Sequence, residues 1–385
     1  MVAYSTLAAV TQMLWLTFAA ITTDTAKHYD VSVSAVGWLS EIFPLLYVLL
    51  AIPAGMLLDR WFRPVLGAGG LLVALGGLVR VGDTFVWAMV GQILIALAQP
   101  VVMSAVSKLA GEYLSEDQRA LGIAVGSAGG FAGMLIALLL GPLIGGSHLG
   151  LLLSVQGTIG LLGAFALLGA LRHPPSYRGE SPTIARGTVS SLWAAPTMRI
   201  LSGLAFLGFG VFVALATWLQ TLLHPDGVSD TTAGGLLVGM IVSGVVGCAV
   251  LPTLVARRGN ERGFMMGVVL VGALGSVMLA LIPALASRLM VLLIMGAVLL
   301  PALPVILTAA ERLAGIELAG TAGAIVWLAG NLGGLVVALL VQALVHHPLS
   351  AFLAMAVIFL SGAPLTLRLT VLPERPSLAI SPTQR

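Results

Sequence analysis

Residues 99–111 read QPVVMSAVSKLAG, and residues 303–315 read LPVILTAAERLAG. The two stretches lie 204 residues apart and share six identities, and the basic residue near the end of each stretch also aligns. At the same spacing and without a gap, residues 126–130 (GSAGG) align with residues 330–334 (GNLGG). Chance similarity between apolar stretches is a poor explanation for this agreement. The sequence therefore predicts two halves built from one repeated unit.

The composition places this repeat in a lipid bilayer. The chain has 385 residues, of which 59% are hydrophobic and 9% are charged, and its mean hydropathy is +1.08. A soluble globular protein is excluded because such domains carry about 25% charged residues, and disorder would need low hydrophobicity. A membrane barrel would show alternating strands of about ten residues, whereas the apolar runs here are continuous. We therefore expect an all-α membrane protein whose helices each use roughly 20 apolar residues to cross the bilayer.

Twelve apolar runs are separated by charged or turn-forming residues. The aligned runs are the fourth and tenth and the fifth and eleventh, so each span matches the one six spans later, in the same orientation. This predicts two six-helix halves, related by a pseudo-two-fold axis along the membrane normal. We expect the halves at 1–171 and 199–371, a cytoplasmic linker at 172–198 and a cytoplasmic tail at 372–385. The expected spans are 5–25, 34–58, 64–82, 85–110, 120–144, 150–171, 199–222, 234–255, 264–284, 288–312, 319–345 and 350–371.

The basic residues fix the expected orientation through the positive-inside rule. We expect the protein in a cell membrane, either a plasma membrane or an inner membrane, with both termini on the cytoplasmic side. In this orientation only Lys27, Arg80 and Arg288 lie at the outer ends of the spans. The net charge of +3 then reflects topology, and no nucleic-acid partner is expected. The fifteen basic residues of the inner segments are Arg60, Arg63, Lys108, Arg119, Arg172, Arg178, Arg186, Arg199, Arg257, Arg258, Arg262, Arg312, Arg368, Arg375 and Arg385.

Parallel halves of this kind are the architecture of the major facilitator superfamily, and one loop resembles a signature of that superfamily. Residues 55–63 read GMLLDRWFR, which resembles the pattern G-x-x-x-D-R-x-x-R. The resemblance implies a gating role for Asp59, Arg60 and Arg63, because an acid at a helix end can pair across the halves and hold one conformation. The equivalent of the acid in the second half is Ala256. The alternative is that these charges only set the topology.

Polar residues inside a span are costly and are therefore candidates for function. Glu41 lies within the second expected span, where it could carry a proton, balance a cationic substrate or pair with Arg80. The alternative is an acid in an outward-facing, water-filled vestibule without a coupling role. Gln99 and Asn331 lie in the middle of their spans, and a buried amide must find a partner in a neighbouring helix or in the substrate.

Several aromatic residues could form a box for a cation. Trp15 lies near the middle of the first span, although tryptophan normally lies at the membrane interface. Its indole face attracts cations, most strongly desolvated quaternary ammonium groups. Phe212, Trp218 and Trp327 could complete such a box, and the alternative for each ring alone is packing between helices.

The first half resembles the feline leukaemia virus subgroup C receptor-related transporters. The resemblance covers roughly residues 5–135 and is carried by ungapped runs at 38–59 and 91–108. It implies choline or ethanolamine as substrates, and that family has also been linked to haem. The resemblance further implies a site built from an aromatic cage and glutamines.

This resemblance assigns site residues one by one. Trp15 matches the tryptophan of the cage, and Gln99 matches the glutamine of the fourth span. Asn331 stands where the eleventh span of the family has a glutamine, and Val213 stands where an aromatic residue is expected. Glu41 has no acidic counterpart in the family. The resemblance therefore implies a small organic cation as substrate. The match to the family is better for the helical scaffold than for the residues of the aromatic cage.

Three functions remain open on the sequence. The first is a secondary active or facilitative transporter of a small amine such as choline, working by rocker-switch alternating access around Trp15, Gln99, Asn331, Phe212 and Trp327. The second is a proton-coupled exporter or exchanger of drugs, metabolites or small anions. It rests on Glu41 and on residues 141–146 (GPLIGG), which resemble the end of the drug/proton antiporter signature. The third is a membrane receptor that does not transport.

An enzyme is not expected. The sequence contains no H-E-x-x-H motif and no ATP-binding G-x-x-x-x-G-K-[ST] motif, and its histidines lie at span ends or in loops. No metal and no cofactor is expected. The expected partners are a small-molecule substrate, with a proton or cation as a candidate co-substrate, and the lipid bilayer around a monomer.

Overall fold

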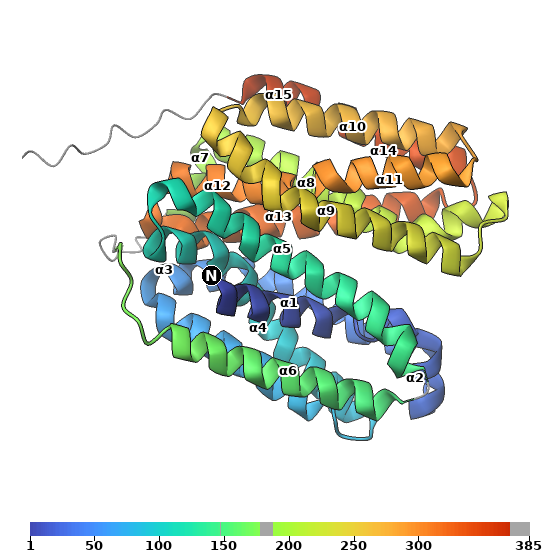
Figure 1. Cartoon of the computed structure of the whole chain (residues 1–385), viewed down its shortest axis with the longest axis horizontal. Helices are drawn as coiled ribbons and strands as arrows, with labels where there is room; N and C mark the ends of the chain where they lie inside the picture. The colour runs from blue at the N-terminus through green and yellow to red at the C-terminus, as the bar shows by residue number, and fades with distance from the viewer. Residues whose placement is uncertain (147, 178–187, 370–385) are drawn as a thin grey trace, which may run out of the picture.

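The computed structural model describes residues 1–146, 148–177 and 188–369, and all regular secondary structure in this part of the chain is helical (Figure 1). All of the predicted tail and the middle of the predicted linker, with Arg178, Arg186, Arg375 and Arg385, lie outside the described residues. The helices are α1 (Val2–Leu16), α2 (Thr22–Tyr29), α3 (Val33–Val79), α4 (Phe85–Tyr113), α5 (Glu116–Leu140), α6 (Leu149–Ala170), α7 (Thr188–Ala194), α8 (Pro196–Leu223), α9 (Asp230–Arg258), α10 (Glu261–Leu281), α11 (Leu285–Leu299), α12 (Ala302–Ala314), α13 (Ala319–Ala343), α14 (Pro348–Leu360) and α15 (Ala363–Arg368).

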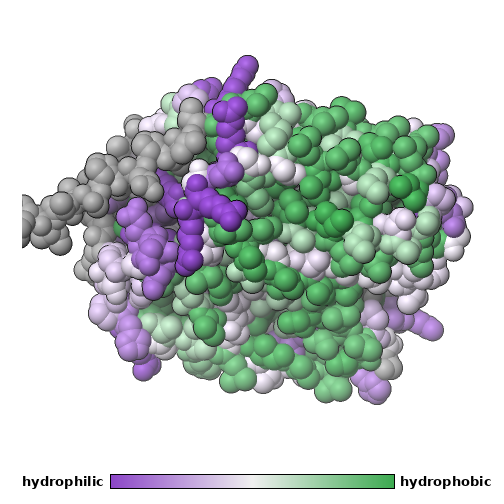
Figure 2. Space-filling view, turned by 45° about the horizontal axis from the view of Figure 1, so that its top comes forward, coloured by the Kyte–Doolittle hydropathy of each residue, from purple (hydrophilic) through white to green (hydrophobic). Residues whose placement is uncertain are grey.

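Within the described residues, ten helical segments are long and apolar enough to cross a membrane. Figure 2 shows hydrophobic residues over most of the visible face, with hydrophilic residues gathered toward its ends. Large apolar side chains on the molecular surface are open to the surroundings, such as Leu162 at 63% and Val357 at 65% exposure. Contiguous apolar surface of this extent needs a lipid environment. The prediction of an all-α, multi-pass membrane protein is confirmed.

The helix boundaries differ from the expected spans in four places, one of which is the last expected span, 350–371, which is divided into α14 and α15. The expected spans 34–58 and 64–82 are joined in α3, because only Trp61 leaves helical geometry (φ −136°, ψ 59°) and the chain kinks there. The expected span 288–312 is divided into α11 and α12, and the break falls at Pro301, whose ring cannot continue a helix. The first expected span is also divided, since α1 ends at Leu16 and a short 3₁₀ turn leads into α2.

The helices pack in matching pairs along the chain. In the first part, α1 packs on α5, and α3 packs on α4 and α6; in the second part, α8 packs on α13, α9 on α11 and α10 on α14. Figure 1 shows α1 to α6 in one group and α8 to α15 in another, with α5 lying along α9 at their border. Two glycines 204 residues apart, Gly129 and Gly333, lie against backbone carbonyls of Ser5 and Phe206, leaving no room for a side chain. Such small residues let helix backbones approach closely.

Candidate substrate-binding site

A chain of aromatic rings crosses the border between the two groups of helices. The ring of Tyr47 in α3 lies 6.3 Å from that of Trp327 in α13, which lies 5.7 Å from that of Phe209 in α8. Phe209 contacts Phe212 at 5.8 Å, and Phe212 contacts Phe131 of α5 at 6.0 Å. The structure thus brings two of the predicted site residues, Phe212 and Trp327, into one aromatic cluster that joins α3 and α5 to α8 and α13.

Trp15 belongs to a separate aromatic pair. Its ring lies 6.1 Å from that of Phe43, at an angle of 32°. Its indole N–H donates a hydrogen bond to the carbonyl oxygen of Ser40 (3.1 Å), which fixes the ring between α1 and α3. The ring remains partly exposed. Trp218 lies elsewhere, with its N–H bonded to the carbonyl oxygen of Ala338.

The predicted amides have different partners. Gln99 of α4 donates from Nε2 to Oε1 of Gln12 in α1 at 2.7 Å, and both side chains are buried. Asn331 donates from Nδ2 to the carbonyl oxygen of Trp327, one turn earlier in its own helix, at 2.8 Å. Gln99 therefore belongs to a contact between helices, whereas Asn331 is bonded to its own backbone.

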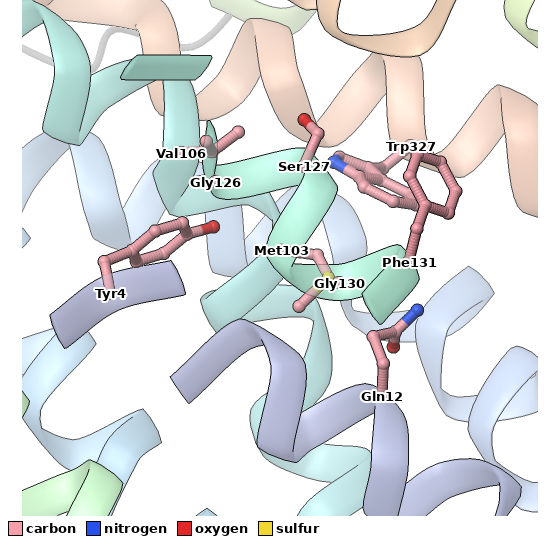
Figure 3. A pocket seen from close by; sticks show the side chains of 9 residues that line it. All are labelled: Tyr4, Gln12, Met103, Val106, Gly126, Ser127, Gly130, Phe131 and Trp327. Atoms are coloured by element: carbon pink, nitrogen blue, oxygen red, sulfur yellow. The ribbon is translucent and has the colours of Figure 1, made fainter. Parts of the chain in front are cut away.

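A cavity lies beside these groups, between α1, α4, α5 and α13 (Figure 3). Its empty volume, which includes solvent-open space, is about 270 Å³. No charged side chain of the described residues lines it. Two of its buried polar atoms, Oγ of Ser127 and Nε1 of Trp327, have no hydrogen-bond partner within the described part of the chain. The lining residues are Tyr4, Gln12, Met103, Val106, Gly126, Ser127, Gly130, Phe131 and Trp327.

Glu41 lies apart from this cavity, on the exposed side of α3. Its suggested partner Arg80 is fully buried and bonded elsewhere. Arg80 donates from Nη1 to the carbonyl oxygen of Leu14 (3.0 Å) and to Gln92 (3.2 Å), and from Nη2 to Gln156 (2.8 Å). Arg80, at the end of α3, is therefore a buried cross-link between α1, α4 and α6, and it is bonded to these helices and not to Glu41.

Asp59 connects the two groups of helices at one end. Its Oδ1 accepts a hydrogen bond from the backbone N–H of Gly320 (2.8 Å). Its Oδ2 accepts from the backbone N–H (2.8 Å) and the hydroxyl (2.5 Å) of Thr321. These N–H groups belong to the first turn of α13, where helices leave their donors unpaired and attract negative charge. Asp59 thus caps a helix of the other group, and we call this set of contacts the Asp59 cap.

The positive partner of Asp59 is Lys108, a residue that the sequence suggested only as a topology charge. Its Nζ lies 3.5 Å from Oδ1 of Asp59 and 3.1 Å from the carbonyl oxygens of both Ile316 and Glu317. Lys108 is buried, so it joins α4 to the segment that leads into α13. The aligned basic residues of the repeat were the only sequence signal for this position.

The two predicted gating arginines lie away from this contact. Arg60 is exposed, with its guanidinium 4.4 Å from the centre of the Trp61 ring. Arg63 donates from both Nε and Nη2 to the carbonyl oxygen of Leu171 at the end of α6. Arg63 therefore ties α3 to α6 within the first group of helices.

A second ion pair lies at the same end of the molecule. Nη1 of Arg119, in the first turn of α5, lies 3.3 Å from Oε1 of Glu311 near the end of α12. No pattern in the sequence paired these two residues. Among the described residues, no group of three or more His, Cys, Asp or Glu side chains is arranged to hold a metal ion.

Known proteins share the sequence pattern of this chain. Solute carrier family 49 member A3 of Danio rerio is 33% identical over 64% of this chain and 56% of its own length. The choline/ethanolamine transporter FLVCR2 of Homo sapiens is 23% identical over 61% of this chain and 50% of its own length. The chain thus spans about half the length of these relatives.

Solved structures share the whole fold. The human organic anion transporter MFSD10 (TETRAN) has a TM-score of 0.77 at 16% identity, covering 94% of this chain and 98% of that chain. The transporter FucP in the outward conformation also has a TM-score of 0.77 at 16% identity, covering 96% and 99%. The sequence profile described as the Major Facilitator Superfamily matches residues 2–338. This chain belongs to the Major Facilitator Superfamily, a family of membrane transporters.

Proposed function

We propose that this protein is a secondary active or facilitative transporter of a small organic cation such as choline, working by alternating access. The observation that carries the proposal is the Asp59 cap. A buried carboxylate of α3 holds the first turn of α13 in the other group of helices, and α13 also supplies Trp327 to a cavity lined by both groups. A contact of this kind can form in one conformation and break in the other, as a rocking transporter requires.

Twelve spans in two halves support this mechanism. Dividing α3 at the Trp61 kink and counting α1 as a span raises the ten candidate segments to twelve. The halves are 1–171 and 199–371, and their helix pairs correspond: α1 with α5 matches α8 with α13, and α4 with α3 matches α11 with α9. A pseudo-two-fold axis along the membrane normal accounts for this correspondence.

The proposed orientation rests on charge. Arg60, Arg63, Lys108 and Arg119 lie at the end of the molecule that holds the Asp59 cap, and the positive-inside rule assigns this end to the cytoplasm. Both termini are then cytoplasmic. The Asp59 cap closes the cytoplasmic end, so the present arrangement is the one in which the site is reached from outside.

The substrate is proposed from the aromatic groups and from the relatives. Trp15 offers a partly exposed ring face between α1 and α3, with the buried ring of Phe43 against it, and no carboxylate is needed to attract a quaternary ammonium to such a face. Gln99 is bonded to Gln12, which lies one turn before Trp15 in α1. The name of FLVCR2 as a choline/ethanolamine transporter supports the same class of substrate.

Uptake into proteoliposomes tests this proposal. The purified full chain should take up labelled choline saturably, with or without an inward-acidic pH gradient. Trp15→Ala should weaken binding roughly 30-fold, because a desolvated cation–π contact contributes about 2 kcal/mol. Trp15→Phe should keep part of the binding, and Trp87→Ala, at an exposed tryptophan of α4, should leave it unchanged. Equal binding by all four proteins would refute the aromatic site.

The second candidate is a proton-coupled exporter or exchanger, and one observation favours it. Glu41 is an exposed carboxyl on a membrane-spanning helix, a costly position unless water or a cation reaches it. If Glu41 couples protons, Glu41→Gln should abolish accumulation driven by a pH gradient while leaving exchange intact. Accumulation that persists in this variant would exclude Glu41 as the coupling residue.

A further inference from the structure

The cavity in Figure 3 contains two buried polar atoms that have no partner in the described part of the chain, and they come from opposite halves. Ser127 Oγ is supplied by α5, and Trp327 Nε1 by α13. Figure 3 shows both side chains among those that line the cavity, with the serine hydroxyl and the indole nitrogen drawn next to each other in this view. An unpaired buried donor costs free energy, so such a pair indicates a group that is bound during function.

The other polar groups of the cavity already have hydrogen-bond partners, and these partners determine which donors and acceptors are left for a ligand. The hydroxyl of Tyr4 donates to the carbonyl oxygen of Val102 at 2.7 Å. Oε1 of Gln12 accepts from Gln99, which leaves the Gln12 amide nitrogen as a donor. The indole N–H can only donate, and a serine hydroxyl can both donate and accept. The cavity therefore offers mainly donors.

This pattern distinguishes between chemical groups. An ammonium offers no acceptor to these donors, whether it is quaternary and carries no N–H or is primary and carries donors only, so it is excluded from this cavity. A carboxylate would enter without any cationic side chain from the described residues that line the cavity, and a buried unpaired charge is costly. A neutral hydroxyl fits, since its oxygen can accept from the indole N–H while its hydrogen is donated to the serine.

We propose that Ser127 and Trp327 form a subsite for a neutral hydroxyl oxygen of the substrate, which bridges the two halves. The proposal rests on the proposed function and deepens it, because it adds a hydroxyl, held by α5 and α13, to the ammonium that the proposed function already gives the substrate. The substrate class is then an amino alcohol. Since the oxygen touches both halves, its binding favours their approach.

The glycines of α5 supply a way to fill this subsite without disturbing the fold. A methyl group at Gly130 would meet only Cγ of Gln12, at 3.6 Å, an ordinary contact distance. A methyl group at Gly126 would instead lie 2.5 Å from Val106 and 2.9 Å from Tyr4. Gly130→Ala should therefore fold normally and occupy space that the substrate needs.

Three probes of similar shape separate the charge from the hydroxyl: choline, propyltrimethylammonium, which lacks the hydroxyl, and 3,3-dimethylbutan-1-ol, which lacks the charge. Binding of each to the purified full chain is measured by calorimetry. Wild-type protein should prefer choline to propyltrimethylammonium by about tenfold, because the second probe leaves the buried donors unpaired. Ser127→Ala or Trp327→Phe should reduce this preference to about twofold or less.

The double variant Ser127→Ala/Trp327→Phe should lose no more preference than either single variant, because one oxygen bridges both groups. Gly130→Ala should weaken choline binding while keeping the melting temperature. Ser154→Ala in α6, whose hydroxyl bonds to its own helix, and Trp87→Phe are matched controls that should keep the wild-type preference.

The outcomes separate this inference from the proposed function. If wild-type protein binds choline and propyltrimethylammonium equally, the hydroxyl subsite is overturned while the amine site stands. If it binds neither amine but binds dimethylbutanol in a way that Ser127→Ala abolishes, the amine function fails and the subsite stands. Unchanged preference in both single variants would mean that the cavity holds only water.

Discussion

The two junctions between the groups of helices, at the end of the molecule that holds the Asp59 cap, use different chemistry, although the repeat predicts that they are counterparts. At the α3–α13 junction, Asp59 caps the first turn of α13, which carries no acidic residue of its own. At the α9–α5 junction, the position equivalent to Asp59 is Ala256, and the first turn of α5 carries its own acids, Glu116 and Asp117.

The comparison explains why only one junction needs this acid. A carboxylate from across the junction adds little stability to a helix N-terminus that already carries acidic residues. It stabilises a helix N-terminus without acidic residues much more. At the start of α5 the ion pair is instead that of Arg119 with Glu311 of α12, and the arginine side chain is 17% exposed while that of Asp59 is fully buried. We therefore expect the Asp59 cap to be the main lock and the Arg119 pair to be the lesser one.

Asp59→Asn should have the largest effect. An amide lacks the charge that the α13 amides attract, and it leaves Lys108 buried without a counter-charge at this position. Breaking a buried pair costs about 3–5 kcal/mol, so the closed cytoplasmic end should be depopulated about 100-fold or more. Ser107→Cys, on the buried α4 face toward α13, reports opening by its rate of alkylation in a Cys248→Ser background.

A thiol within the second half is the control for this experiment. Ser276→Cys is buried in α10 and should stay protected in the Asp59→Asn variant, which separates opening from unfolding. If Asp59→Asn leaves the alkylation rate at position 107 unchanged, the Asp59 cap does not hold the end closed.

Lys108→Met should have the next largest effect. The variant keeps the apolar stem and removes the ammonium from Asp59 and from the carbonyls of Ile316 and Glu317. Asp59 still receives three hydrogen bonds, so the loss should be about 1–3 kcal/mol, smaller than for Asp59→Asn. Lys27→Met, at an exposed lysine of α2, is the matched control. Effects of Lys108→Met and Asp59→Asn that simply add would contradict a shared contact, because coupled residues are non-additive.

From the sequence, the fold could be predicted more completely than the contacts between individual side chains. Hydropathy, charge placement and the 204-residue repeat were enough for a helical membrane protein of this superfamily, since these signals are distributed over the whole chain. The partners of Asp59 could not be predicted, because they are backbone N–H groups, which every residue except proline possesses. The backbone N–H groups of Gly320 and Thr321 are available to Asp59 only because these residues lie in the first turn of α13.

The candidate site shows the same limit. Trp15, Gln99 and Trp327 stand out because such residues are rare inside spans, but Ser127 is inconspicuous within a glycine-rich run. Arg80 stands near the end of an apolar run, where an arginine ordinarily faces water, so its position alone did not reveal that it is buried. Its burial depends on Gln92 and Gln156 from two other helices, a combination that no local pattern reveals.

Arg119→Gln should have a small effect. In the pair with Glu311 only the arginine reaches the surface (17% exposed, against 3% for Glu311), and a glutamine amide can still donate to the carboxylate, so the loss should be about 1 kcal/mol and alkylation at position 107 should rise no more than about fivefold. The increase should shrink further in high salt, which screens exposed charges. An effect as large as that of Asp59→Asn would mean that both contacts stabilise the closed end equally.

Ala256→Asp should have the smallest effect, and it tests why the junctions differ. The new acid would face the first turn of α5, where Glu116 and Asp117 repel it, so the attraction to the helix start is offset. We expect the population of the closed end to change by no more than about twofold, since a charge at a helix terminus contributes about 0.3–1 kcal/mol even without repulsion.

Removing the native acids should reverse this result. In a Glu116→Gln/Asp117→Asn background, the start of α5 resembles that of α13, and Ala256→Asp should then protect position 107 from alkylation by up to about fivefold. Protection in the wild-type background as well would show that α5 lacks enough negative charge of its own. No protection in either background would mean that α9 and α5 are not arranged as α3 and α13 are, because the same carboxylate at the same register would have found no helix start to cap.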